Sequence, residues 1–379
     1  MLRKNTMLLA LIVIMLFFQT MILALGKGSL FSPSNVTNLF SQNAYVVILA
    51  TGMLLCILTG GNIDLSIGSI VALVGALAGT LIVNMKVNIY LSIILCLLAG
   101  VLLGAWQAYW IAYKRIPAFI VTLAGMLTFR GVALILLQGL TISPFPEEYT
   151  KYFNGYIASG SGQLVVSVII GIIICAILIG VQVISRRNKI KKGVAVESLF
   201  FMIVKLFLLC DVVLIILALL GQDKGIPVIL ILLTAVVLVY NYFTSNTVPG
   251  RHLYAMGGNE KAASLSGIDT NKTLFFAYTN MGFLAAVAAL VCVSRFNSAA
   301  PTAGTNYEMD AIGACYIGGA SAYGGVGTVG GAIIGAAFMG ILNNGMSILG
   351  VDANWQRAVK GLVLLAAVIF DVISKKRKS

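Results

Sequence analysis

The sequence predicts an all-α polytopic membrane protein that forms one membrane domain over residues 1–379. Of the 379 residues, 60% are apolar and only 10% are charged, whereas a soluble domain carries about 25% charged residues. Apolar runs of about 20 residues recur along the chain, and each is long enough to cross a hydrocarbon core of roughly 30 Å. A transmembrane barrel would show short alternating segments instead, so the continuous runs predict helices.

Twelve apolar segments follow one another in the sequence. Eleven are full length, at residues 7–25, 43–60, 63–83, 88–113, 117–138, 163–184, 198–220, 226–245, 272–293, 326–348 and 355–373. A shorter run near 309–320 predicts a half-crossing helix. The first segment resembles a signal peptide, but no A-x-A cleavage site follows it, so a retained helix is expected.

The placement of basic residues predicts the orientation. The net charge is +13, and most of the Lys and Arg residues fall in short loops and tails that alternate along the chain. Twelve crossings place both basic termini in the cytoplasm, in agreement with the positive-inside rule. Topology therefore explains the basic charge, and no nucleic-acid partner is expected.

Enzymatic motifs are missing from the sequence. No G-x-x-x-x-G-K-[ST] phosphate loop occurs, and the single histidine, His252, excludes a His-rich metal site or a Ser-His-Asp triad. The six cysteines lie in apolar runs without a C-x-x-C pair, as buried small hydrophobic residues do. We therefore expect a non-enzymatic chain without a metal site, and any ATP that drives it is hydrolysed by another chain.

Two glycine-rich stretches interrupt the apolar segments, at residues 60–69 and 318–331. Paired stretches of this kind often mark the pathway of a transporter. Two interpretations stay open: an internal duplication that builds the pathway, or small residues that simply allow helices to pack closely.

Ionisable residues inside the apolar segments are few. Intramembrane charge is costly and suggests a functional site. Asp64 and Asp310 begin helical segments, so Asp64 is either a pathway residue or a helix cap. Lys205 and Asp211 are expected to pair or to extend toward the interface. The remaining such residues are Arg130 and Lys360.

The polar interval at residues 250–268 lies on the cytoplasmic side by the charge argument. A short helix is predicted at 259–266, with Asn259 capping its start and Gly267 ending it. This helix is too short to span a bilayer and carries too few cations to anchor to anionic lipid. A docking element for a cytoplasmic partner and an ordinary amphipathic loop are the two interpretations.

Four motifs occur in order along the chain. They are G-N-I-D-L-S-I-G-S at 61–69, P-A-F-I-V-T-L at 117–123, G-R-H-L-Y-A-M-G-G-N-E-K-A-A-S-L-S-G-I-D at 250–269 and the glycine-rich stretch at 318–331. Together they resemble the permease subunits of monosaccharide ATP-binding-cassette (ABC) importers of the ribose, xylose and galactose type. The resemblance covers essentially the whole chain.

This resemblance implies a homodimeric permease that is embedded in the lipid of the bacterial cell membrane. It implies a sugar-binding protein outside, and a twin-cassette ATPase inside that holds ATP and Mg²⁺, with no cofactor on this chain. The implied fold is like that of the vitamin B12 importer, with about ten helices per subunit. Residues 186–247 depart from it by inserting a basic loop and two further spans, which resembles the xylose and multiple-monosaccharide subgroup.

The resemblance also implies which residues carry the function. The ATPase-coupling segment would use Arg251, Tyr254, Ala255, Gly257, Gly258, Asn259, Glu260, Ala263, Ser266 and Gly267. The pathway candidates are Gly61, Asn62, Asp64, Ser66, Phe119, Asn280, Asn343 and Asn344. The alternatives are a stand-alone secondary sugar carrier or facilitator and a membrane scaffold without transport activity.

Overall fold

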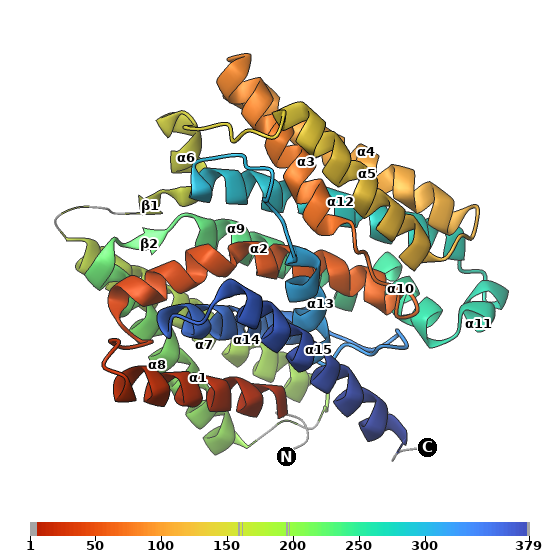
Figure 1. Ribbon diagram of the computed structural model, residues 1–379. Coiled ribbons are helices and arrows are strands. Elements are labelled where there is room, and N and C mark those ends of the chain that lie inside the picture. The colour runs from red at the N-terminus through yellow and green to blue at the C-terminus, as the bar shows by residue number, and fades with distance from the viewer. Residues whose placement is uncertain (1–5, 158–159, 161, 195, 197, 377–379) are drawn as a thin grey trace.

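The computed structural model describes residues 6–157, 160, 162–194, 196 and 198–376, and it is almost entirely helical (Figure 1). Its elements are α1 (Thr6–Ala24), α2 (Pro33–Leu58), α3 (Ile67–Gly79), the π-helical turn η2 (Thr80–Asn84), α4 (Ile89–Ala112), α5 (Ala118–Leu137), α6 (Glu147–Asn154), β1 (Tyr156–Ile157), α7 (Gln163–Lys191), α8 (Leu199–Asp223), β2 (Ile226–Pro227), α9 (Ile229–Asn246), α10 (Val248–Gly258), α11 (Glu260–Leu265), α12 (Thr270–Phe296), α13 (Tyr307–Ile317), α14 (Val329–Ile348) and α15 (Ala353–Lys376). The predicted all-α membrane fold is confirmed.

Ten described helical segments are long and apolar enough to cross a membrane: α1, α2, α3 with η2, α4, α5, α7, α8, α9, α12 and α14. The remaining two predicted segments are also helices. One is the short helix α13, of 11 residues. The other is α15, whose 24 residues include Arg357, Lys360 and Asp371. All twelve predicted apolar segments therefore correspond to helices.

The core consists of the helices α2, α3, α12 and α14, whose spans are mostly buried inside the protein. Small residues allow this close packing, because a glycine lets two backbones approach where a side chain would separate them. Gly100 and Gly104 on α4 face Gly282 on α12, and a Cβ added at Gly104 would lie 2.7 Å from the Tyr278 carbonyl oxygen. The helices α1, α4, α7 and α8 expose most of their spans and surround this core.

Two helix boundaries differ from the predicted ones, and two helices were not predicted. Helix α2 begins at Pro33 rather than near 43. Its first turns contain polar residues that interrupt the apolar run, and Asn35 and Asn43 among them form hydrogen bonds inside the protein. Helix α7 continues to Lys191, so the basic stretch that begins at Arg186, expected as a loop, is helical over its first turns. Helices α6 and α10 were not predicted, because both are short and polar.

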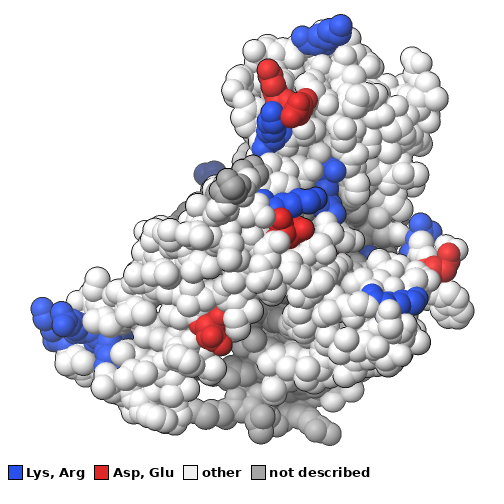
Figure 2. All heavy atoms as spheres, turned by 90° about the vertical axis from the view of Figure 1, so that its left-hand side faces the viewer, with Lys and Arg blue, Asp and Glu red and all other residues white. Residues whose placement is uncertain are grey.

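The two ends of the molecule differ. Helices α10 and α11 lie at one end, on the right in Figure 1, and the last turns of α15 lie at the lower right. The opposite end carries α6 and the antiparallel pair of β1 and β2, in which Tyr156 faces Pro227. Viewed from that end, acidic and basic side chains form small groups separated by uncharged surface (Figure 2).

Candidate coupling surface and translocation pathway

The predicted coupling segment folds into two short helices joined by an extended residue. Just before α10, the Thr247 side chain accepts a hydrogen bond from the Gly250 N–H at 3.1 Å and caps the helix. Asn259 has φ −162° and ψ 106°, and its side chain accepts from the Ala262 N–H at 3.0 Å, which begins α11 as predicted. Gly267 ends the segment with φ +85°, a conformation that favours glycine.

The coupling segment has an inner and an outer face. Leu253, Met256 and Ala263 are buried against the rest of the chain, and Tyr254 and Gly257 are half-buried. The other coupling candidates are exposed: Arg251, Ala255, Gly258, Asn259, Glu260, Ser266 and Gly267. Leu265 at the end of α11 is 91% exposed. It was not among the candidate site residues, although an apolar residue between two serines was a usable signal.

Polar contacts tie this segment to the membrane helices. Arg115, in the turn between α4 and α5, forms an ion pair with Glu260 and donates to Thr270 at 2.8 Å and to Asn271 at 2.6 Å. Burial raises the pKa of Tyr254, so its hydroxyl stays protonated and donates to the Gly327 carbonyl oxygen at 2.9 Å. The segment is thus held from two sides.

The two glycine-rich stretches meet beneath α10. The Gly325 N–H donates to the Leu58 carbonyl oxygen at 3.1 Å. A Cβ added at Gly257 would overlap that same oxygen, and it would lie 2.8 Å from the Cα of Gly325. A Cβ at Gly61 would overlap the Ala322 carbonyl oxygen. The backbone of the coupling segment therefore touches the last residue of α2 and the loop that leads into α14, and that loop touches the one that leads into α3.

Asp64 is fully enclosed at the start of α3. Its Oδ1 accepts from the Ser66 N–H at 2.8 Å and from the Ser66 hydroxyl at 2.6 Å. Gln107 of α4 donates to the same Ser66 hydroxyl at 2.7 Å. Asp64 is 1% exposed and Ser66 is 0% exposed, so in this conformation Asp64 orders the loop before α3 and does not face open solvent.

The other pathway candidates lie on separate elements. Asn62 is half-exposed, whereas Phe119 on α5 is 55% exposed. Asn280 on α12 accepts a hydrogen bond from the Tyr240 hydroxyl on α9 at 2.5 Å. Asn344 on α14 exchanges hydrogen bonds of 2.9 and 3.0 Å with Asn35 on α2, and the adjacent Asn343 is 7% exposed. This conformation brings Asp64 together with Ser66 and does not place all candidates around one cavity.

Two charged residues of the membrane region, Asp310 and Arg130, are bonded by neighbouring elements. Asp310 on α13 forms an ion pair with Lys360 on α15 at 2.9 Å and accepts from the Tyr45 hydroxyl on α2 at 2.7 Å. Arg130 donates to the carbonyl oxygens of Pro301 at 3.1 Å and Ala303 at 2.6 Å. No group of three or more His, Cys, Asp or Glu side chains suited to a metal ion occurs among the residues that the structure describes.

Breaking the Asp310–Lys360 pair should destabilise the protein more than removing it. We expect Lys360→Met to cost about 3–5 kcal/mol, because it leaves the Asp310 carboxylate buried without a cation. The double variant Asp310→Asn with Lys360→Met should recover most of that loss. Thermal unfolding of the detergent-purified variants measures both. Equal unfolding temperatures for the single and double variants would contradict a paired role.

Comparison with known proteins places the chain among transport permeases. The family described as the permease component of the branched-chain amino acid transport system matches residues 35–368. The xylose transport system permease protein of Haemophilus influenzae is 38% identical over 372 residues, covering 98% of this chain and 96% of that protein. Its Escherichia coli K12 counterpart is 39% identical over 371 residues, covering 98% and 92%. The ribose import permease protein of Escherichia coli K12 is 33% identical over 370 residues, covering 98% and 94%. No solved structure matches the chain.

Proposed function

Because the chain belongs to the family of permease components of the branched-chain amino acid transport system, we propose that it is the membrane subunit of an ATP-driven importer of monosaccharides. Its similarity to the xylose permeases exceeds that to the ribose permeases, which favours xylose-like sugars. The energy comes from a separate ATPase, and the sugar is delivered by an extracytoplasmic binding protein. The functional unit is a homodimer in the bacterial inner membrane.

The observation that carries this proposal is the contact of Gly257 with Leu58 and Gly325. A movement of α10 and α11 reaches the end of α2 and the loop before α14 through backbone atoms, without flexible side chains between them. The exposed side of α11, with Leu265 at its end, provides the surface for the ATPase. We place α10, α11 and both termini in the cytoplasm, in agreement with the positive-inside rule.

The pathway would hold sugar weakly, because affinity resides in the binding protein and a tight site would slow release. In the proposed cycle, ATP binding and hydrolysis move α10 and α11, and the helices that begin at the glycine loops follow. Asp64 and Ser66 order one of these loops, so they act on the pathway through the position of α3.

Association with the ATPase tests the function. We expect the permease to co-purify with the twin-cassette ATPase encoded with it, and sugar-loaded binding protein to stimulate ATP hydrolysis in reconstituted vesicles. Leu265→Asp should reduce co-purification at least about tenfold, since exposed apolar residues that anchor an interface contribute 2 kcal/mol or more. Leu140→Asp, at a leucine that is 69% exposed in the loop between α5 and α6, is the matched control.

Sugar uptake by the purified chain in vesicles that contain no ATPase would instead favour a secondary carrier. Equal co-purification of the Leu265 and Leu140 variants would contradict the assigned docking surface.

A further inference from the structure

Helices α7 and α8 pack tightly only in the half nearest β1 and β2. Small residues at Ser167, Gly171 and Cys175 recur at every fourth position of α7 and are buried. A Cβ added at Gly171 would lie 3.0 Å from a Leu214 methyl group on α8, and the Cys175 thiol donates to the Cys210 carbonyl oxygen at 3.7 Å. Close contact here fixes the pair, so their other ends need not touch.

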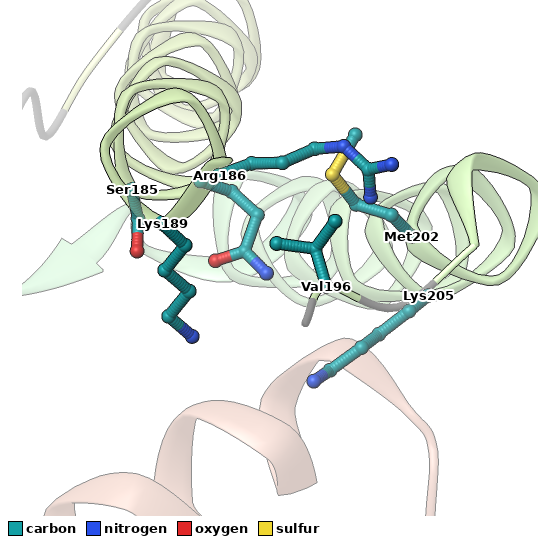
Figure 3. Close-up of a pocket in the computed structure, with 7 residues that line it drawn as sticks. Ser185, Arg186, Lys189, Val196, Met202 and Lys205 are labelled. Carbon is teal, nitrogen blue, oxygen red and sulfur yellow. The ribbon is translucent and has the colours of Figure 1, made fainter. Parts of the chain in front are cut away.

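At those other ends the two helices enclose a polar pocket of about 310 Å³. It is lined by Gln182, Ser185, Arg186, Lys189, Val196, Met202 and Lys205. The four residues from α7 follow the spacing i, i+3, i+4 and i+7, which places them on one face of the helix. In Figure 3, Arg186 extends from α7 toward Met202, and the side chains of Lys189 and Lys205 point to the same side of the pocket.

The two lysines of this pocket lack a carboxylate partner. No ion pair joins Lys189 or Lys205 to an acidic residue within the described part of the chain. Asp211, six residues further along α8, does not pair with Lys205 there, and Glu197 lies outside the described residues. Arg186 has an interaction of its own, so the inference rests on the two lysines.

The position of Lys205 along α8 indicates which kind of anion could neutralise its charge. Six residues separate Lys205 from the start of α8, which places it about 9 Å along the helix. A cation at this depth in an apolar span is costly unless it reaches the headgroup region or meets an anion. The surface of α8 next to Lys205 is apolar and exposed, with Phe201 four residues before it at 58% and Leu208 three residues after it at 57%. Such a surface suits acyl chains.

We propose that this pocket binds the phosphate headgroup of an anionic phospholipid. Lys189 and Lys205 hold the phosphate from the two helices, Gln182 and Ser185 supply polar contacts, and the acyl chains lie along the exposed apolar surface of α8 beside Lys205. Basic pockets between membrane helices are suited to anionic lipid headgroups. The proposal depends only on the location of the chain in a membrane, so it stands apart from the direction and energy source of transport.

Lipid binding to the purified protein tests this site. Native mass spectrometry in detergent would titrate phosphatidylglycerol or cardiolipin against wild type and the double variant Lys189→Gln with Lys205→Gln. We expect the double variant to bind anionic lipid about tenfold more weakly, with unchanged binding of phosphatidylcholine. The matched control, Arg187→Gln with Lys191→Gln, also removes two positive charges, both near the end of α7, but neither residue lines the pocket.

Each outcome of the titration decides the proposal. If both double variants lose the same affinity for anionic lipid, the lipid is attracted to a basic surface in general, and the defined site is overturned. So would an absence of preference for anionic lipid, or displacement of the lipid by millimolar inorganic phosphate. Should the glutamine variant unfold, Lys189→Arg with Lys205→Arg keeps both charges and must retain wild-type binding; its failure to do so in folded protein would also overturn the site.

Discussion

Replacing Gly257 by alanine is expected to lower ATP-driven sugar uptake at least tenfold while leaving the protein in the membrane. The added methyl group would overlap the Leu58 carbonyl oxygen, which already accepts the Gly325 N–H. Neither backbone atom can rotate away as a side chain would, so α10 must shift. Steric overpacking of this kind costs about 1–3 kcal/mol, and 1.4 kcal/mol corresponds to about a tenfold change in population.

Three measurements separate the causes of a loss in the Gly257→Ala variant. Uptake in vesicles that contain the ATPase gives the functional effect, co-purification reports docking, and thermal unfolding reports the fold. Gly131→Ala on α5 is the control, because nothing lies within 4 Å of the added methyl group. Wild-type uptake by the Gly257 variant would show that the contact at Gly257 is not needed to couple the ATPase to transport.

Replacing Gly282 by valine should prevent stable folding of the membrane core. A Cβ at this position would overlap the Gly100 carbonyl oxygen and would lie 2.7 Å from the Gly104 Cα. Both obstacles are backbone atoms of α4, so the two helices must separate along the crossing. We expect the free energy of unfolding to fall by at least about 3 kcal/mol, which is at the upper end for an overpacked core.

The yield of monodisperse protein on size-exclusion chromatography and its unfolding temperature measure the effect of Gly282→Val. Gly131→Val provides the same substitution at an open position. If the Gly282 variant is as stable as this control, close approach of the backbones of α4 and α12 is not required for the core.

The fold could be predicted from the sequence because apolar length and helix formation are local properties. The family could be recognised from the ordered motifs, and the family match confirms it. The N-cap role of Asn259 was also predictable, since the cap and its partner N–H lie three residues apart. The short polar helices α6 and α10 were missed because each lacks an apolar run.

The contacts of the candidate site could not be predicted from local patterns. Arg115 and Glu260 are 145 residues apart in the chain, and only the fold brings them together. Both glycine stretches stand out in the sequence, but their contact with each other and that of Gly325 with Gly257 depend on backbone geometry that residue type does not encode. Asp64 could have been a cap or a pathway residue. Its enclosure with Ser66 favours an ordering role, and the pathway assignment stays a prediction.

The Asp310–Lys360 pair also constrains the order in which the protein is made. Lys360 emerges from the ribosome 50 residues after Asp310, and both partners belong to elements that enter the membrane late in synthesis. Until α15 inserts, the acid on α13 has Tyr45 as its only described bonding partner. The core therefore lacks one of its charges while the chain is being synthesised, and a truncated product ending before residue 360 would keep the Asp310 carboxylate without its cation.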